Sequence, residues 1–189
     1  MDFFNNQIRE LIVRNIDIDK NFEYEQFKVG RSNITFKIFD DDNSYVLRRP
    51  PYGNKLESAH NMSREFKIIA ELSKNNLKVP KPIFLYTEKE ITEDDFYIME
   101  YIEGKTISDN IEAELLSNDE KQTISNSFIK TIADIHNFDV VNSKLEDLGK
   151  HQGYVERQLN RWTKQFEAQK VRNIDELDYA TELLFKNIP

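Results

Sequence analysis

The chain has 189 residues, of which 39% are hydrophobic and 32% charged, so it is long enough for one compact domain or two small lobes and too apolar for a disordered segment. Its net charge of −8 argues against nonspecific binding to nucleic acid or anionic membranes, and the absence of cysteine excludes disulfides and cysteine-based zinc sites. With no apolar run of membrane-spanning length and no signal peptide, the expected location is the cytoplasm.

The first hundred residues combine helical and strand periodicities. Apolar residues at helical spacing predict helices, and alternation of apolar and polar residues predicts strands between turn-forming clusters such as the one at 40–43. In chain order we expect a helix at 2–15, strands at 22–29, 34–38 and 44–49, a helix at 58–75, a strand at 83–86, and a hairpin formed by 90–92 and 96–102.

Beyond Gly104 the sequence is almost wholly helical. Ser117 followed by Glu120 fits a capping box, which predicts a helix that runs to about Asn137. We expect this helix to bury Phe128, Ile132 and Ile135, and we expect two further helices at 151–169 and 174–187. Strands followed by helices predict an α+β fold with two domains, at 1–103 and 104–189, that meet at a linker near Gly104.

A glycine-containing turn separates the first two strands. It consists of Gly30, Arg31, Ser32 and Asn33. Such a turn lets successive backbone N–H groups approach a ligand, and these groups can bind phosphate oxygens. An ordinary hairpin turn is the alternative interpretation.

The third strand carries two consecutive arginines. Because side chains alternate along a strand, Val46 and Arg48 share one face while Leu47 and Arg49 lie on the other. One arginine therefore points to the same side as Val46, towards any ligand under the glycine turn. Two solvated arginines at the end of a strand are the alternative.

The helix at 58–75 carries a carboxylate within its apolar stripe. Glu65 falls in the arc occupied by Met62, Phe66 and Ile69. A buried carboxylate is costly unless it is paired, and the arginine on the preceding strand is the obvious partner. A flanking position, from which the charge reaches solvent, is the alternative.

The strand at 96–102 runs out into the linker. Clefts between domains are favoured ligand sites, and the backbone here can offer C=O and N–H groups to a planar ring. The candidate residues are Met99, Glu100 and Ile102. The alternative is a buried strand with a polar exit.

Taken in order, these segments resemble the aminoglycoside phosphotransferase family, which shares the protein-kinase-like fold with choline kinases. The segments that carry the resemblance are Gly30–Asn33, Val46–Pro51, Ser58–His60, Arg64–Glu65, Met99–Gly104, Ile135–Asp139 and Arg157–Trp162. The stretch Val46–Pro51, followed by Ser58–His60, is similar to the branch associated with acyl-CoA dehydrogenases. The resemblance implies a kinase-like N-lobe, with an antiparallel sheet of about five strands and a helix, followed by a hinge and the first helices of a C-lobe.

The resemblance also implies an ATP site. The turn Gly30, Arg31, Ser32 and Asn33 would cover the phosphates, and Arg48 would stand where most kinases have a phosphate-binding lysine, with Glu65 as its partner. Val46 would cover the adenine face, and Glu100 C=O and Ile102 N–H, next to Met99, would meet its edge.

The catalytic parts of this family are missing from the sequence. None of the three histidines begins the His-Gly-Asp segment, and the later metal-binding aspartate has no counterpart, so we assign no catalytic and no metal-binding residue. The chain thus resembles the N-terminal half of an enzyme that uses ATP and Mg²⁺ on a small hydroxylated acceptor, and we expect no activity from it alone. Its exposed helices would be covered by self-association or a second polypeptide. A non-catalytic module that binds a nucleotide or a partner is the alternative function.

Overall fold

The computed structural model describes residues 3–27, 33–52, 60–107, 109–149 and 152–188. The chain forms two compact units, Met1–Leu145 and Glu146–Pro189, which are described separately below. This division by compactness does not test the boundary between functional lobes near Gly104, which stays a prediction.

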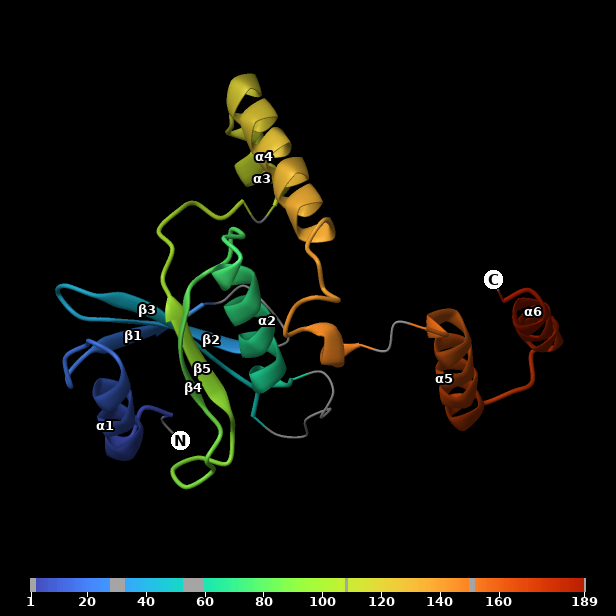
Figure 1. The fold of residues 1–189 in the computed structure, drawn as a ribbon, viewed down its shortest axis with the longest axis horizontal. Coiled ribbons are helices and arrows are strands. Elements are labelled where there is room, and N and C mark those ends of the chain that lie inside the picture. The colour runs from blue at the N-terminus through green and yellow to red at the C-terminus, as the bar shows by residue number, and fades with distance from the viewer. Residues whose placement is uncertain (1–2, 28–32, 53–59, 108, 150–151, 189) are drawn as a thin grey trace. The chain divides into compact units, whose positions relative to one another are not determined.

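A five-stranded antiparallel sheet forms the centre of the first unit (Figure 1). Its strands, in spatial order, are β1 (Glu23–Gln26), β2 (Ile34–Phe39), β3 (Ser44–Arg49), β5 (Phe96–Glu100) and β4 (Pro82–Tyr86). The predicted turn between β2 and β3 is confirmed: the Asp40 N–H donates to Asn43 C=O, and the Asp40 carboxylate accepts from the N–H groups of Asp42 and Asn43. This tight turn fixes the register that pairs Thr35 with Arg48.

The hairpin predicted from 90–92 and 96–102 is wrong. Strand β5 pairs with β3 and β4, and residues 90–92 lie in the loop between β4 and β5. The polar groups of this loop make other contacts: the Ile91 N–H donates to the Tyr86 hydroxyl, and Lys89 pairs with Asp95. Ile91, the apolar residue of this segment, packs against the hydrophobic core instead of pairing in a strand.

One face of the sheet forms the main hydrophobic core. Helix α1 (Asn6–Asn15) covers this face and contributes Ile8 and Ile12, and the Asn5 side chain caps the helix by accepting from the Ile8 N–H. The helix begins four residues later than predicted, because Phe3 and Phe4 pack into the core ahead of it.

Helix α2 (Met62–Lys74) lies on the opposite face of the sheet and contacts β4 and β5 (Figure 1). The Asn61 side chain begins the helix by accepting from the Arg64 N–H at 2.8 Å. Met62 is fully buried, and the Phe66 ring meets the Tyr97 ring edge-on, with centroids 6.0 Å apart. This packing fixes which side of α2 faces the sheet.

The helices α3 (Asn110–Glu114) and α4 (Asn118–His136) follow the sheet in the first unit. The predicted capping box of α4 is confirmed, since the Glu120 N–H donates to Ser117 Oγ and the Ser117 N–H donates to Glu120 Oε2. The predicted buried face of Phe128, Ile132 and Ile135 is wrong: Phe128 is 62% exposed, Ile135 is 42% exposed and Ile132 is half-buried. The reason is that no described element packs extensively on α4.

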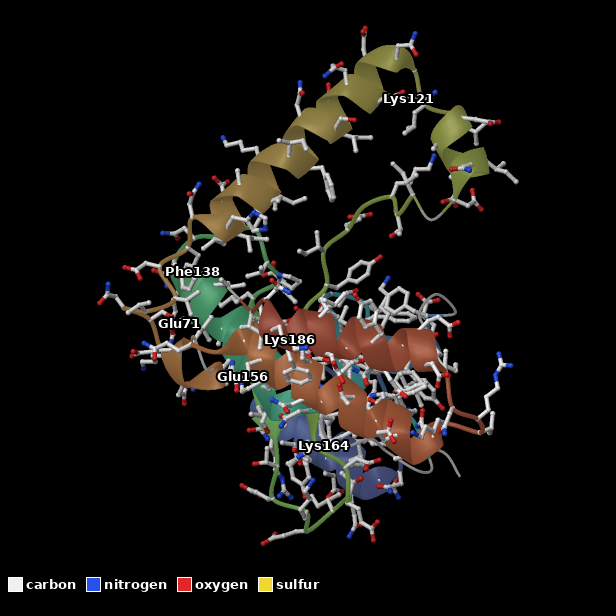
Figure 2. All side chains as sticks on the ribbon, turned by 90° about the vertical axis from the view of Figure 1, so that its right-hand side faces the viewer. Glu71, Lys121, Phe138, Glu156, Lys164 and Lys186 are labelled. Carbon is white, nitrogen blue, oxygen red and sulfur yellow. The ribbon has the colours of Figure 1, made fainter. Side chains whose placement is uncertain are left out.

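The second unit contains a short 3-10 turn (Glu146–Leu148) and the helices α5 (Tyr154–Gln169) and α6 (Asp175–Lys186). The two helices lie side by side and antiparallel, with Glu156 near the start of α5 and Lys186 at the end of α6 at the same end of the pair (Figure 2). A largely apolar groove of about 510 Å³ runs between them, lined in part by Trp162, Phe166 and Leu184. None of the helices in the described part of the chain could cross a membrane.

Candidate functional site

The two arginines of β3 lie on opposite faces of the sheet, as the strand periodicity predicts. Arg49 is only 2% exposed, its guanidinium lies over the rings of Phe3 and Tyr52 at 4.5 and 4.0 Å, and its Nη2 pairs with Asp94 Oδ2 at 2.5 Å. Burial lowers the pKa of Arg49. This arginine is part of the core, which leaves Arg48 as the β3 arginine on the α2 face.

Arg48 forms the predicted ion pair with Glu65. Its Nε donates to Glu65 Oε2 at 2.8 Å, and each of the two side chains is about one-third exposed. Arg48 Nη1 also donates to the hydroxyl of Thr35, across the β2–β3 ladder, at 3.3 Å. With two of its nitrogens held in this way, the guanidinium is oriented rather than free to rotate.

Among the described residues, three side chains donate to the Glu65 carboxylate. Arg48 and the Tyr97 hydroxyl share Oε2, the latter at 3.1 Å, and Asn33 Nδ2 donates to Oε1 at 2.8 Å. Tyr97 is only 1% exposed, and its burial, together with the Glu65 charge, raises the pKa of this phenol. Tyr97 therefore remains a neutral donor at physiological pH.

His60 extends the cluster by one further hydrogen bond. Its Nδ1 lies 2.7 Å from Asn33 Oδ1. His60 directly precedes Asn61, the residue that caps α2. The cluster consequently ties the start of β2 to the segment that leads into α2.

An apolar surface continues from Arg48 along the same face of the sheet. Val46 is two residues away, about 7 Å along the strand, and it lies opposite Met99 of β5. Val46 is buried and Met99 half-buried. Lys37, the β2 neighbour of Val46, places its ammonium 4.4 Å from the centre of the Tyr101 ring. This face thus combines an apolar patch with cations on either side.

The chain leaves the sheet at the end of β5. The Glu100 N–H donates to Lys81 C=O at 2.9 Å, which fixes the last residue of the strand. Ile102 is 58% exposed, and its N–H makes no hydrogen bond to another described backbone group. The backbone at Ile102 can therefore donate to a ligand.

Of the predicted site residues, the structure brings Asn33, Arg48 and Glu65 together and pairs Val46 with Met99. Gly30, Arg31 and Ser32 lie outside the described residues. Sequence reasoning missed the roles of four residues: Thr35, Lys37, His60 and Tyr97. The first two and Tyr97 could have been found by extending the period-two argument to the neighbouring strands, whereas His60 stood only in a segment of the family resemblance, without a role.

The geometry allows a ligand with a planar apolar part and an anionic part. Arg48 Nη2 makes no hydrogen bond to any described residue, although the other two nitrogens are held, so it can donate to an anion. Val46 and Met99 provide an apolar surface for a ring. These features fit a nucleotide. Within the described residues, no three histidine, aspartate or glutamate side chains gather closely enough to hold a metal ion.

The sequence matches the model of the phosphotransferase enzyme family over residues 23–189. It is 34% identical over 164 residues to human acyl-CoA dehydrogenase family member 11, a match that covers 87% of this chain and 21% of the relative. It is 32% identical over 167 residues to mouse acyl-CoA dehydrogenase family member 10, covering 88% of this chain and 16% of that protein. The chain thus spans about a fifth of the length of the curated relatives it matches.

A solved structure has the same fold. The crystal structure of a "putative aminoglycoside phosphotransferase" from Ralstonia eutropha is 28% identical and superimposes with a TM-score of 0.74. The match covers 96% of this chain and 53% of the other. The five-stranded sheet and its helices are therefore those of a kinase-like phosphotransferase fold.

Proposed function

We propose that this chain, which belongs to the phosphotransferase enzyme family, is the ATP-binding part of a small-molecule kinase. The observation that carries the proposal is the Arg48–Glu65 pair, held in one orientation beside the apolar patch of Val46 and Met99. Arg48 occupies the place at which kinases use a lysine to bind phosphates. Glu65 and Thr35 hold two nitrogens of its guanidinium, so the remaining nitrogen, Nη2, can donate to a phosphate oxygen in a fixed direction.

The other residues of the face complete this assignment. The adenine ring would lie against Val46 and Met99, with its edge towards Glu100 C=O and Ile102 N–H. The turn of Gly30, Arg31, Ser32 and Asn33 would supply backbone N–H groups to the phosphates. ATP carries the phosphoryl group that such an enzyme transfers, and this chain's residues bind and orient the nucleotide.

Transfer itself is proposed to need residues outside this chain. The sequence has no His-Gly-Asp segment and no later metal-binding aspartate, which the family uses for the acceptor hydroxyl and for Mg²⁺. We therefore expect no phosphorylation of a small hydroxylated acceptor by these 189 residues. A cytoplasmic location, expected from the sequence, is part of the same proposal.

Calorimetric titration with MgATP tests the binding role. We expect Arg48→Ala to weaken binding at least about tenfold, because a charge-assisted hydrogen bond is lost. Arg64→Ala is the matched control, since Arg64 is an exposed arginine at the start of α2. Equal affinities for the wild type and for Arg48→Ala would overturn the assignment of Arg48.

The exposed apolar groove between α5 and α6 favours a second candidate function, a non-catalytic module that binds a partner. The partner would be a second copy of the chain or another polypeptide with an apolar helix. Sedimentation at increasing concentration, with Leu184→Asp as the groove variant, tests the first of these. A wild-type chain that stays monomeric throughout would count against self-association.

A further inference from the structure

The hydrogen bonds around Asn33 have only one possible direction. The Glu65 carboxylate, which is paired with Arg48, can only accept, so the Asn33 amide nitrogen must face Glu65. The carbonyl oxygen of Asn33 then faces His60, and it too can only accept. The His60 Nδ1 must consequently carry a hydrogen. The resulting chain of donors runs from His60 to Asn33 to Glu65.

This directionality has a consequence for the phosphate-binding arginine. Glu65 Oε1 receives the Asn33 donor, while Oε2 receives Arg48 and Tyr97. If Asn33 loses its partner at His60, its amide is free to rotate and the hold on Oε1 is released. Glu65 can then turn about its last torsion, and Arg48 loses its fixed partner. Hydrogen bonds that share a network in this way reinforce one another.

We propose that His60 is a positioning residue for nucleotide binding: by donating from Nδ1 to Asn33, it holds Asn33, Glu65 and through them Arg48 in the geometry that receives a phosphate. The effect on ATP rests on the function proposed above, whereas the hydrogen-bond chain does not. His60 reaches Asn33 across 27 residues of sequence and directly precedes Asn61, the cap of α2. It thus joins Asn33, the residue before β2, to the start of the helix that carries Glu65.

A packing role for His60 would predict different behaviour. The imidazole is half-buried and lines a cavity of about 500 Å³ with Asp94, Asp95 and Lys89. Any ring of similar size could fill that position without regard to its donors. A positioning role instead requires a donor at the place of Nδ1, so the two roles can be separated by substitutions that keep or remove that donor.

Nitrogen NMR of the imidazole tests the hydrogen-bond chain in the ligand-free protein. At about pH 8.5, where an unperturbed imidazole is neutral, we expect His60 to carry its hydrogen on Nδ1. His136, which lies exposed in the last turn of α4, is the reference. A His60 ring with its hydrogen on Nε2 would overturn the proposal, because that tautomer cannot donate to Asn33.

Three substitutions test the positioning of Arg48. Asparagine places an amide N–H close to the position of the imidazole Nδ1, glutamine places it near Nε2, and alanine has no donor. We therefore expect the Arg48 Nε–H resonance to stay protected from solvent exchange in His60→Asn and to exchange faster in His60→Gln and His60→Ala. Equal protection in all three variants would overturn the proposal, whether or not the protein binds ATP.

The same variants test the effect of His60 on the affinity for the nucleotide. MgATP should bind about fivefold more weakly to His60→Ala and His60→Gln, the cost of about one hydrogen bond. His60→Asn should bind as the wild type does, and His136→Ala is the control. Loss of affinity in His60→Asn as large as in His60→Ala would contradict the positioning role. A wild type that does not bind MgATP would instead refute the proposed function and leave the exchange measurement to decide on His60.

Discussion

Arg48 and Arg49 are adjacent in the sequence, yet their guanidinium groups lie in different environments, one partly exposed and the other buried. Arg49 is enclosed by two aromatic rings and an aspartate, and its Nε and Nη1 have no hydrogen-bond partner among the described residues. Arg48 is one-third exposed, with two nitrogens held and a third available. The first arginine therefore contributes to the fold, and the second is suited to bind a ligand.

The burial of Arg49 makes the free energy of unfolding sensitive to Asp94. Removing one partner of a buried ion pair leaves the other charge uncompensated, so we expect Asp94→Ala to lower the free energy of unfolding by about 3 kcal/mol. The additional change Arg49→Met should restore much of this loss, because it removes the stranded charge and keeps an apolar side chain. Urea denaturation measures both.

The exposed neighbour Glu93 provides the control for this cycle. Glu93→Ala should change the free energy of unfolding by no more than about 0.5 kcal/mol, as is usual for a surface substitution. An Asp94→Ala variant as stable as Glu93→Ala would contradict the assigned role of the pair.

Tyr97 links the site to the pH dependence of stability. Because burial and the Glu65 charge raise its pKa above the ordinary value of 10, the folded protein keeps the phenol protonated where the unfolded chain ionises. The corresponding stability is fully present below pH 10 and is lost as the pH rises from 10 through the raised pKa. Melting temperatures at pH 9 and 11 should therefore differ less in Tyr97→Phe than in the wild type. Tyr179→Phe, at an exposed tyrosine, should behave as the wild type, and an unchanged pH dependence in Tyr97→Phe would refute the argument.

At the scale of elements, local sequence patterns correctly predicted the features that depend on residues close in sequence, such as the direction of a side chain on a strand or helix. The period of β3 separated Arg48 from Arg49, and the wheel of α2 placed Glu65 towards the sheet. The strand predicted at 90–92 does not form, because strand pairing depends on residues distant in sequence. Strand β5 pairs with β3 and β4 instead. The contacts of His60 and Tyr97 join residues 27 and 32 positions apart, and no local period reports them.

The capping box of α4 predicts a pH dependence confined to the start of that helix. Hydrogen bonds from the backbone and side chain of Ser117 lower the pKa of Glu120 below its ordinary value of 4.5. The contribution of this carboxylate to the helix is thus complete above pH 4.5 and is lost as the pH falls through the lowered pKa. The Cα chemical shifts of residues 118–121 should move towards coil values over this range.

The substitution Glu120→Gln distinguishes the contribution of the Glu120 charge from that of the capping hydrogen bonds. Because Gln also serves in a capping box, Glu120→Gln should keep the helix start and remove its pH dependence. Ser117→Ala should loosen the helix start at every pH. A Glu120→Gln variant whose shifts still titrate as in the wild type would show that another group is responsible.

At the scale of the whole molecule, burial is distributed unevenly along the chain. All but one of the buried core residues lie within the first hundred residues, whereas α4, α5 and α6 bury none among the residues described. This chain covers 53% of the solved chain titled a putative aminoglycoside phosphotransferase. The sequence could predict these helices and their amphipathic spacing, but a buried face also depends on what packs against it.

The central claim is that the α2 face of the sheet binds ATP, with adenine at Val46 and Met99 and phosphate at Arg48. Intermolecular nuclear Overhauser effects between adenine protons and the methyl groups of the chain, measured with methyl-labelled protein and MgATP, test it most directly. We predict contacts from the adenine ring to the methyl groups of Val46 and Met99, and their loss in Arg48→Ala at the same nucleotide concentration. Adenine contacts to methyl groups of the α5–α6 groove, or none in the wild type, would contradict the account.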